Sequence, residues 1–402
     1  MSSNLQLLGY INGGNTYDGQ YFGLDSPQLS AFGEQITSEN VPIIQEAFPY
    51  NIIPDLEYIK TTSGAGAITA EDGKAKLSVT SGTDTAELTH RMYIRYRTGQ
   101  GLLMRWTCYF NNFGANTNGY IGYFDDQDGY ILSYNTTDGL SIIRRYAGVD
   151  TTVIQSNFNF DVLDGVGESA FNYDPTKGNV FQLSFQWLGY GMIVFSIENP
   201  ETGSFIPFHK IKYANSSANT SIKNPSLRFN MLLESAGNAG ELYCPSIAIF
   251  NQGPMRLNGP IFSEENTLAV SGSPDPVLAI RNKTLHNGLT NRSPVNIKLI
   301  SCAYADVGSC IVRILLNPTI TGGTWSDVDT NETPVEVNKT MTGYSGGRVV
   351  ASFTLTDHDK EIIQFDDFKT VLQPDYSILI VFDNTGGGSG DALASISWRN
   401  DM

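Results

Sequence analysis

The sequence has few of the side chains that most often carry out chemistry in proteins. Its 402 residues include 4 His and 4 Cys. No Cys-x-x-Cys pair or mixed Cys/His cluster has the spacing that binds zinc. This shortage argues against a zinc centre and leaves few candidates for a nucleophile with a base beside it. The composition therefore indicates no reaction and predicts no cofactor.

Charge is scarce as well, and most of it has one sign. Charged residues make up 16% of the chain, and 25 basic against 41 acidic residues give a net charge of −16. An average soluble protein has about 25% charged residues. A charge-poor, acidic chain is a poor partner for nucleic acid or for an anionic membrane surface. We therefore expect neither as a partner.

Long apolar runs are missing too. No window approaches 18 consecutive apolar residues, so we expect no spanning helix. The first residues, MSSNLQLLGYINGG, have neither the basic region nor the apolar stretch of a secretory signal. We expect synthesis in a cytoplasm, which also suits the four cysteines, without excluding a later life outside the cell.

Helical periodicity is nearly absent. The best helical candidate is the stretch 27–32, which Gly33 ends. Short β-branched and aromatic runs instead recur about every ten residues, separated by Gly, Asn, Asp and Pro. They are 76–80, 92–97, 102–110, 130–134, 140–146, 180–188 and 192–197. This pattern predicts an all-β protein whose antiparallel sheets pack face to face.

The first 45 residues differ in texture from the rest. They are rich in Gly, Asn and Ser, show little alternation, and predict an extended N-terminal arm. One interpretation is an arm draped over its own surface. The other is an arm whose aromatic residues dock on a neighbouring subunit, because such a segment buries little by itself. The candidate assembly residues are Tyr10, Tyr17, Tyr21, Phe22 and Phe32.

A second change of texture falls at 251–276, which is rich in Pro, Gly and Ser. A new series of strand-like runs follows at 277–280, 295–304, 310–316, 333–337, 348–355, 377–383 and 392–398. The chain is also longer than one hydrophobic core usually supports. We therefore predict two antiparallel, jelly-roll-like β-sandwich domains after the arm, 46–255 and 256–402.

Two acidic loops are the candidates for a metal ion. Asp125, Asp126 and Asp128 precede Gly129, and such a loop can wrap calcium in oxygen ligands. A hairpin turn explains the same letters more simply, because the spacing and terminal Glu of an EF-hand loop are missing. The loop 161–165 (DVLDG) has the same two interpretations.

The cysteines and histidines support no catalytic assignment. Cys302 and Cys310 stand eight apart around a predicted turn, a spacing that could close a hairpin disulfide. Gly-x-Ser-x-Gly occurs at 343–347, but a β-like run follows where a hydrolase has a helix, so a turn is the better interpretation. The histidines, which we interpret as strand or surface residues, are His90, His209, His286 and His358.

Several short motifs between residues 92 and 230 recur together. They are TGQG (98–101), GYF (122–124), DGY (128–130), QSNFN (155–159), LDG (163–165), DPTK (174–177), WLGYG (187–191), HKIKYAN (209–215) and PSLR (225–228). The later domain adds AIRNK (279–283), NG (287–288), NRSPV (291–295), SGGR (345–348) and SWR (397–399). With these motifs the chain resembles structural proteins of tailed bacteriophages and some large DNA viruses.

This resemblance implies a concanavalin- or laminin-G-like sandwich and no catalytic residues. It also implies a virion component, such as a capsid decoration, a head fibre or a tail or baseplate part. Its expected partners are other virion proteins and copies of itself, in a trimer or another cyclic oligomer. We therefore expect a non-enzymatic structural protein located in the virion.

Two alternatives stay open on the same fold. The first is a carbohydrate-binding adhesin or receptor-binding protein that contacts host surface glycans, motivated by aromatic and Asn-rich loops. The second is a polysaccharide-cleaving enzyme, motivated only by the two acidic loops, because glycoside hydrolysis uses a pair of carboxyl groups. Fold alone does not decide among the three functions.

Overall fold

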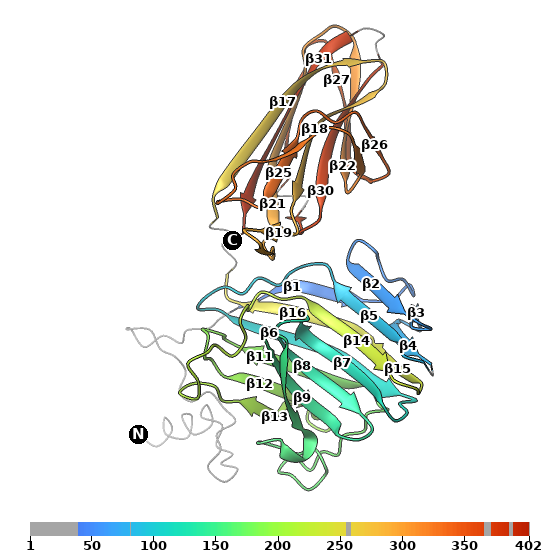
Figure 1. Ribbon diagram of the computed structural model, residues 1–402, viewed down its shortest axis with the longest axis vertical. Helices are drawn as coiled ribbons and strands as arrows, with labels where there is room; N and C mark the ends of the chain where they lie inside the picture. Colours follow the sequence, from blue (N-terminus) through green and yellow to red (C-terminus); the bar gives the residue numbers. More distant parts are fainter. Residues whose placement is uncertain (1–38, 81, 255–258, 366–370, 386–388, 402) are drawn as a thin grey trace, which may run out of the picture.

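The protein is all-β, as the sequence predicts. The computed structural model describes residues 39–402 apart from 81, 255–258, 366–370, 386–388 and 402. Its strands form two bodies stacked along the long axis of the molecule (Figure 1). The aromatic residues of the predicted arm and the helical candidate 27–32 lie outside the described residues. Strand β1 (Asn40–Ala47) takes up the last part of the segment predicted as an arm.

The first body packs two sheets face to face. One sheet has the order β13 (Phe205–Ile211), β12 (Ile193–Glu198), β11 (Asn179–Phe185), β6 (Gly101–Asn111), β15 (Gly240–Cys244), β4 (Lys74–Val79) and β3 (Ala67–Glu71), with β16 (Ser246–Gln252) joining β6 to β1. The other has the order β10 (Val149–Ile154), β9 (Gly139–Tyr146), β8 (Gly129–Asn135), β7 (Thr117–Phe124), β14 (Phe229–Ser235), β5 (Thr85–His90) and β2 (Tyr58–Ser63). A short 3-10 turn, η1 (Gln155–Asn157), follows β10.

Alternating side chains explain why these strands face each other. In β4 (KAKLSV) and β5 (TAELTH) every second residue is buried, which is the period of a strand with one face on a core. Trp106 of β6 meets Phe229 of β14 across the sandwich, with ring centroids 5.8 Å apart. Large aromatic residues of both sheets therefore build one shared core.

The second body is a separate sandwich with its own core. One sheet has the order β17 (Ile261–Ser271), β31 (Ser389–Asn400), β21 (Val295–Tyr304) and β28 (Lys360–Gln364), with β29 (Val371–Leu372) beside β21. The other has the order β24 (Trp325–Asp327), β25 (Val335–Asn338), β18 (Pro274–Asn282), β30 (Ser377–Asn384), β22 (Ser309–Leu316) and β27 (Arg348–Thr356). Two small two-stranded sheets complete it: the hairpin of β19 (Leu285–His286) with β20 (Leu289–Thr290), and β23 (Thr319–Thr321) paired with β26 (Gly343–Ser345).

Two local predictions are wrong. Residues 92–97 form no strand but an extended segment with a single bridge, Ile94 to Leu227. Side chains instead of a neighbouring strand accept hydrogen bonds from its backbone: the Tyr93 N–H donates to the side chain of Gln373, and the Tyr96 N–H donates to that of Ser226. The Pro- and Gly-rich seam at 251–276 contains the long strand β17, whose glutamates hide its alternation.

The prediction of a turn at 343–347 is confirmed. Gly346 and Gly347 turn the chain between β26 and β27 at φ +63° and +84°, values that glycine adopts at little cost, so the Gly-x-Ser-x-Gly letters mark a turn. Cys302 and Cys310 are free, buried thiols in the second core, which leaves the possible hairpin disulfide unformed. No helix among the described residues is long and apolar enough to cross a membrane.

Candidate functional site

Ion pairs join the two sandwiches. Asp401, at the end of the second body, receives Arg97 of the first at 2.8 Å and Arg95 at 3.6 Å. Arg292, in the irregular segment before β21, reaches the Asp125 carboxylate of the first body. The Tyr376 hydroxyl donates to the Leu56 carbonyl at 2.8 Å. These contacts set the walls of the cleft between the bodies.

The predicted calcium aspartates hold a turn and this interface. The Asp125 carboxylate accepts the backbone N–H groups of Gln127 and Asp128 at 2.9 and 2.8 Å, besides the Arg292 guanidinium. The Asp128 carboxylate is buried and accepts three backbone N–H groups, from Lys223, Asn224 and, at 3.5 Å, Ala147. Asp126 is exposed between them. The carboxylate oxygens that a calcium ion would need therefore already accept hydrogen bonds from backbone N–H groups.

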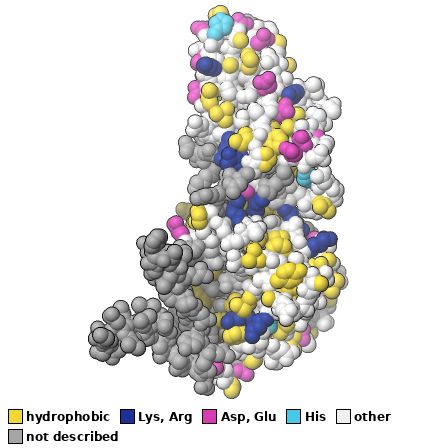
Figure 2. Space-filling view, turned by 90° about the vertical axis from the view of Figure 1, so that its left-hand side faces the viewer, with side chains coloured by type: hydrophobic (Ala, Val, Ile, Leu, Met, Phe, Trp, Pro, Cys, Tyr) yellow, Lys and Arg dark blue, Asp and Glu magenta, His cyan; other side chains and the backbone are white. Residues whose placement is uncertain are grey.

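Three hollows open in the cleft, and all three share Arg91 and Tyr376 as lining residues. They measure about 460, 200 and 390 Å³. Figure 2 shows Lys and Arg side chains gathered at the waist between the bodies. We name the second the Arg228 hollow. It is lined by Ile59, Arg91, Tyr93, Arg228, Thr284, Thr290, Asn291, Gln373, Pro374, Asp375 and Tyr376.

Arg91 is held in place by the backbone of the first body. Its Nε donates to the carbonyls of Asp55 and Tyr58 at 2.7 and 3.1 Å. The guanidinium lies 5.8 Å from the centre of the Tyr376 ring, within the range of a cation–π contact. Burial raises the pKa of the Tyr376 phenol, so this group remains a neutral hydrogen-bonding group in the cleft.

Arg228 has a different environment. Its guanidinium lies over the Tyr93 ring, 4.0 Å from the centroid. Its Nε is buried and has no hydrogen-bond partner within the described part of the chain. Burial lowers the pKa of the guanidinium, and the charge of Arg91 adds to that effect. Arg228 is therefore a half-buried cation beside another cation.

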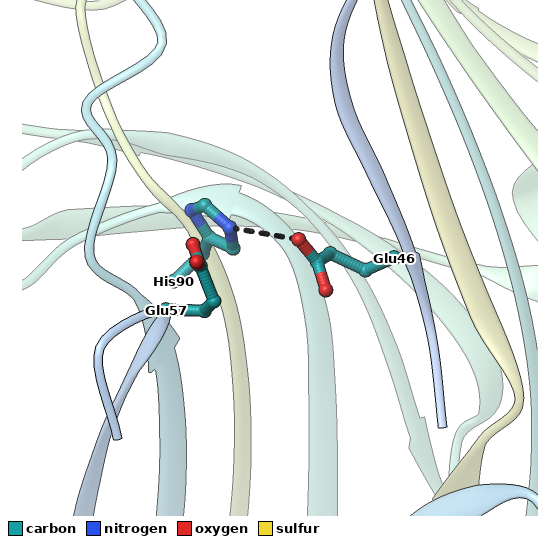
Figure 3. A group of neighbouring side chains, drawn as sticks. All are labelled: Glu46, Glu57 and His90. Atoms are coloured by element: carbon teal, nitrogen blue, oxygen red, sulfur yellow. Dashed lines mark ion pairs between the residues drawn. The ribbon is translucent and has the colours of Figure 1, made fainter. Parts of the chain in front are cut away.

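A second group of titratable side chains lies beside the 460 Å³ hollow. Glu46, Glu57 and His90 place their ligand atoms within 4.8 Å of one another, and they come from β1, the segment before β2 and the end of β5 (Figure 3). His90 is 2% exposed, and its Nε2 faces the Glu46 carboxylate at 3.8 Å. Glu57 also lines the 460 Å³ hollow.

The hydrogen bonding of His90 favours a proton over a metal ion in this group. Its Nδ1 accepts the Met92 N–H at 3.1 Å, so the neutral ring carries its proton on Nε2. A metal at Nε2 would move that proton to Nδ1, against the Met92 N–H. Histidine ligands of metals usually donate from the other nitrogen. The Nε2–H group therefore faces the Glu46 carboxylate from 3.8 Å, beyond hydrogen-bonding distance.

The remaining sequence candidates lie away from the cleft or in structural roles. In the loop 161–165, Asp161 is buried and accepts the N–H groups of Leu163 and Ser169, while Asp164 accepts that of Val166. His209 is buried in β13, and burial lowers its pKa. The aspartates 125, 126 and 128 form no group of metal-ligand spacing in the described residues.

Sequence reasoning missed the cleft residues themselves. Arg91, Arg228 and Tyr376 come from distant parts of the chain, and only the packing of two domains brings them together. The alternation of 92–97 correctly separates Tyr93, Arg95 and Arg97 from the buried Ile94 and Tyr96. That polar face is the one local feature of the sequence that points to the cleft. Its residues contact the second body.

Comparison with known proteins establishes no family. No family model and no curated protein matches the chain. Among solved structures, the carbohydrate recognition domain of Emp47p is 11% identical over 52% of this chain and 93% of its own, with a TM-score of 0.33. A structure described under endo-acting O-glycanases of the human gut microbiota is 13% identical over 53% and 100%, with a TM-score of 0.37.

A sialidase is 9% identical over 48% of this chain and 17% of its own, with a TM-score of 0.31. None of these three is described as a viral protein, so the resemblance to virion proteins stays a prediction. At these identities and TM-scores the similarities assign no function. The strand order of the chain itself defines its fold as two stacked antiparallel β-sandwiches.

Proposed function

We propose that this chain is a carbohydrate-binding protein whose site is the cleft between its two sandwiches. One observation carries the proposal: the Arg228 hollow collects hydrogen-bonding groups of both kinds around two tyrosines. Guanidinium groups donate, the Asp375 carboxylate accepts, and the hydroxyls of Thr284 and Thr290 do both. Sugar hydroxyls also donate and accept, so this lining matches their chemistry.

The size of the hollow suits a single sugar unit. Small-molecule sites commonly measure about 300–1,000 Å³, and the Arg228 hollow measures about 200 Å³. The neighbouring hollows of about 460 and 390 Å³ share its walls at Arg91 and Tyr376. A glycan chain would therefore place one unit in the Arg228 hollow and further units beside it.

We propose binding without turnover. Glycoside hydrolysis uses two carboxyl groups that flank the bond to be cleaved. Asp375 is the one carboxylate among the described residues that line the Arg228 hollow. Glu46 and Glu57 do lie close together, but Glu46 lines none of the three hollows of the described cleft. The Glu46–Glu57 pair therefore lies apart from the Arg228 hollow. In the neighbouring 390 Å³ hollow, which Asp55 and Asp375 line, Asp55 is paired with Lys60 at 2.8 Å.

A glycan array probed with the full chain tests the proposal. We expect selective binding that falls at least tenfold in Asp375→Ala, because that change removes the acceptor in the hollow. Asp391→Ala is the matched control, since this exposed aspartate lies in β31, outside the cleft. An array that stays blank at high protein concentration would overturn the proposal.

The sequence resemblance supports a further proposal about location. The motifs between 92 and 230 and in the later domain predict a structural virion component that assembles with copies of itself. Carbohydrate binding is compatible with that location, because a repeated surface protein gains avidity for glycans from its copies. Mass spectrometry of virions purified from a virus that carries this chain should detect it. Its absence from such particles would contradict the virion role and leave the binding proposal standing.

A further inference from the structure

The Arg228 hollow concentrates positive charge in an acidic protein. The chain carries a net charge of −16, yet Arg91 and Arg228 line the same hollow. The charges of Arg91 and Arg292 both act on Arg228. Like charges in a partly dehydrated site repel each other more strongly than in water. Placing these arginines together is therefore unfavourable unless something negative joins them.

Several other arginines of the molecule have carboxylate partners. Arg97 pairs with Asp401 at 2.8 Å, Arg145 pairs with Asp150 at 2.7 Å, and Arg281 pairs with Glu336 at 2.6 Å. Arg91 and Arg228 form no ion pair with any described residue, although Asp375 lines the same hollow.

The Arg228 guanidinium is also short of hydrogen bonds. Tyr93 covers one face of it at 4.0 Å, and its buried Nε donates to no described residue. A buried donor without a partner costs free energy, and a charged donor costs more. The arrangement therefore lacks an acceptor, and an anionic one would satisfy both the charge and the donor.

We propose that the Arg228 hollow binds the carboxylate of an acidic sugar, an inference that rests on the carbohydrate-binding function proposed above. A planar guanidinium donates two parallel hydrogen bonds to a carboxylate. Asp375 accepts from the hydroxyls of the same sugar, and its negative charge disfavours a doubly charged phosphate in so small a space. Uronic acids and nonulosonic acids such as sialic acid share this chemistry, a carboxylate on a pyranose ring.

Titration calorimetry of the full chain with three monosaccharides tests the inference. The probes are glucuronic acid, N-acetylneuraminic acid and methyl glucoside, which separate the two acidic sources from a neutral sugar. We expect one or both acids to bind at least tenfold more tightly than methyl glucoside, with an affinity that falls as salt rises.

Two variants assign the effect to Arg228. Arg228→Gln should lower the affinity for the acid at least tenfold, and Arg228→Lys, which keeps the charge without the planar fork, should lower it less. Arg105→Gln is the matched control, because Arg105 is exposed on β6 and also lies over an aromatic ring, that of Phe205 at 4.9 Å. Thermal unfolding of Arg228→Gln should occur at no lower temperature than that of the parent protein, because the change removes a poorly compensated cation.

The outcomes separate the inference from the function on which it rests. If methyl glucoside binds as tightly as the acids, or Arg228→Gln binds the acid unchanged, the inference is overturned and carbohydrate binding in the cleft stands. If no monosaccharide and no arrayed glycan binds, both fail. If both Arg228 variants unfold, salt dependence and the preference for acid over neutral sugar in the parent protein decide.

Discussion

The pair between Arg292 and Asp125 allows a quantitative test of how the two sandwiches are joined. The change is Arg292→Ala. Arg292 reaches across from the segment before β21, and its side chain is 10% exposed while that of Asp125 is 25% exposed. The pair is therefore mostly buried, and the Asp125 carboxylate keeps two backbone N–H donors when the guanidinium is removed.

The size of the effect follows from that burial. Removing one member of a fully buried pair costs about 3–5 kcal/mol, because the other charge is left uncompensated. The two remaining hydrogen bonds to Asp125 and the partial exposure of both groups reduce this cost. We expect a loss of about 1–3 kcal/mol, between the values for surface and buried pairs. The loss should fall on the coupling of the domains, because each sandwich has its own core.

Differential scanning calorimetry measures this coupling. In Arg292→Ala the unfolding transition should broaden or split, and the less stable sandwich should unfold several degrees earlier. Lys74→Ala is the control, because the Lys74–Asp72 pair is 4.0 Å long with Asp72 89% exposed, and it should cost under about 1 kcal/mol. A profile for Arg292→Ala that overlays that of Lys74→Ala would refute the reasoning.

Three further predictions concern His209, the buried cysteines and Arg228. Burial lowers the pKa of His209, so below about pH 6.5 the unfolded chain binds a proton that the folded chain does not, and the free energy of unfolding should fall there by at most about 1.4 kcal/mol per pH unit. In denaturant melts of His209→Gln, the free energy of unfolding should fall less steeply as the pH drops. An equally steep fall would contradict this. Burial raises the pKa of Cys302 and Cys244 to about 12 and that of Cys310 to about 11. A thiol reagent at pH 8 should therefore label the native protein slowly and should label all four thiols after denaturation. Rapid labelling of the native protein would count against buried thiols. Arg228→Met keeps the contact with Tyr93 and removes a poorly compensated cation. It should therefore raise the free energy of unfolding by about 1 kcal/mol, the low end of values for replacing buried charges. A clear loss of stability in urea unfolding would assign Arg228 a structural role.

Much of the fold could be predicted because it depends on local patterns. The run 295–304 coincides with β21, and 130–134 and 140–146 lie within β8 and β9. Each combines β-branched or aromatic residues with a turn at Asp or Gly, and those features act over a few residues. Strand β17 escaped because Glu264 and Glu265 break its apolar alternation at an exposed edge.

The cleft could not be predicted, because it depends on contacts between distant residues. Gln373 receives the N–H of Tyr93, 280 positions away, and Asp401 receives Arg97, 304 positions away. No periodicity in one segment reports on such partners. The same limit applies to Asp125, whose neighbours in the sequence suggest a loop for calcium while its partner Arg292 lies in the other domain.

A crystal structure of the full chain with the array glycan that it binds most tightly tests whether the cleft is the carbohydrate site. We expect glycan density in the cleft, with one sugar unit in the Arg228 hollow and a sugar oxygen within hydrogen-bonding distance of the guanidinium group of Arg91 or Arg228. Density on another surface, with the cleft unchanged, would contradict this expectation.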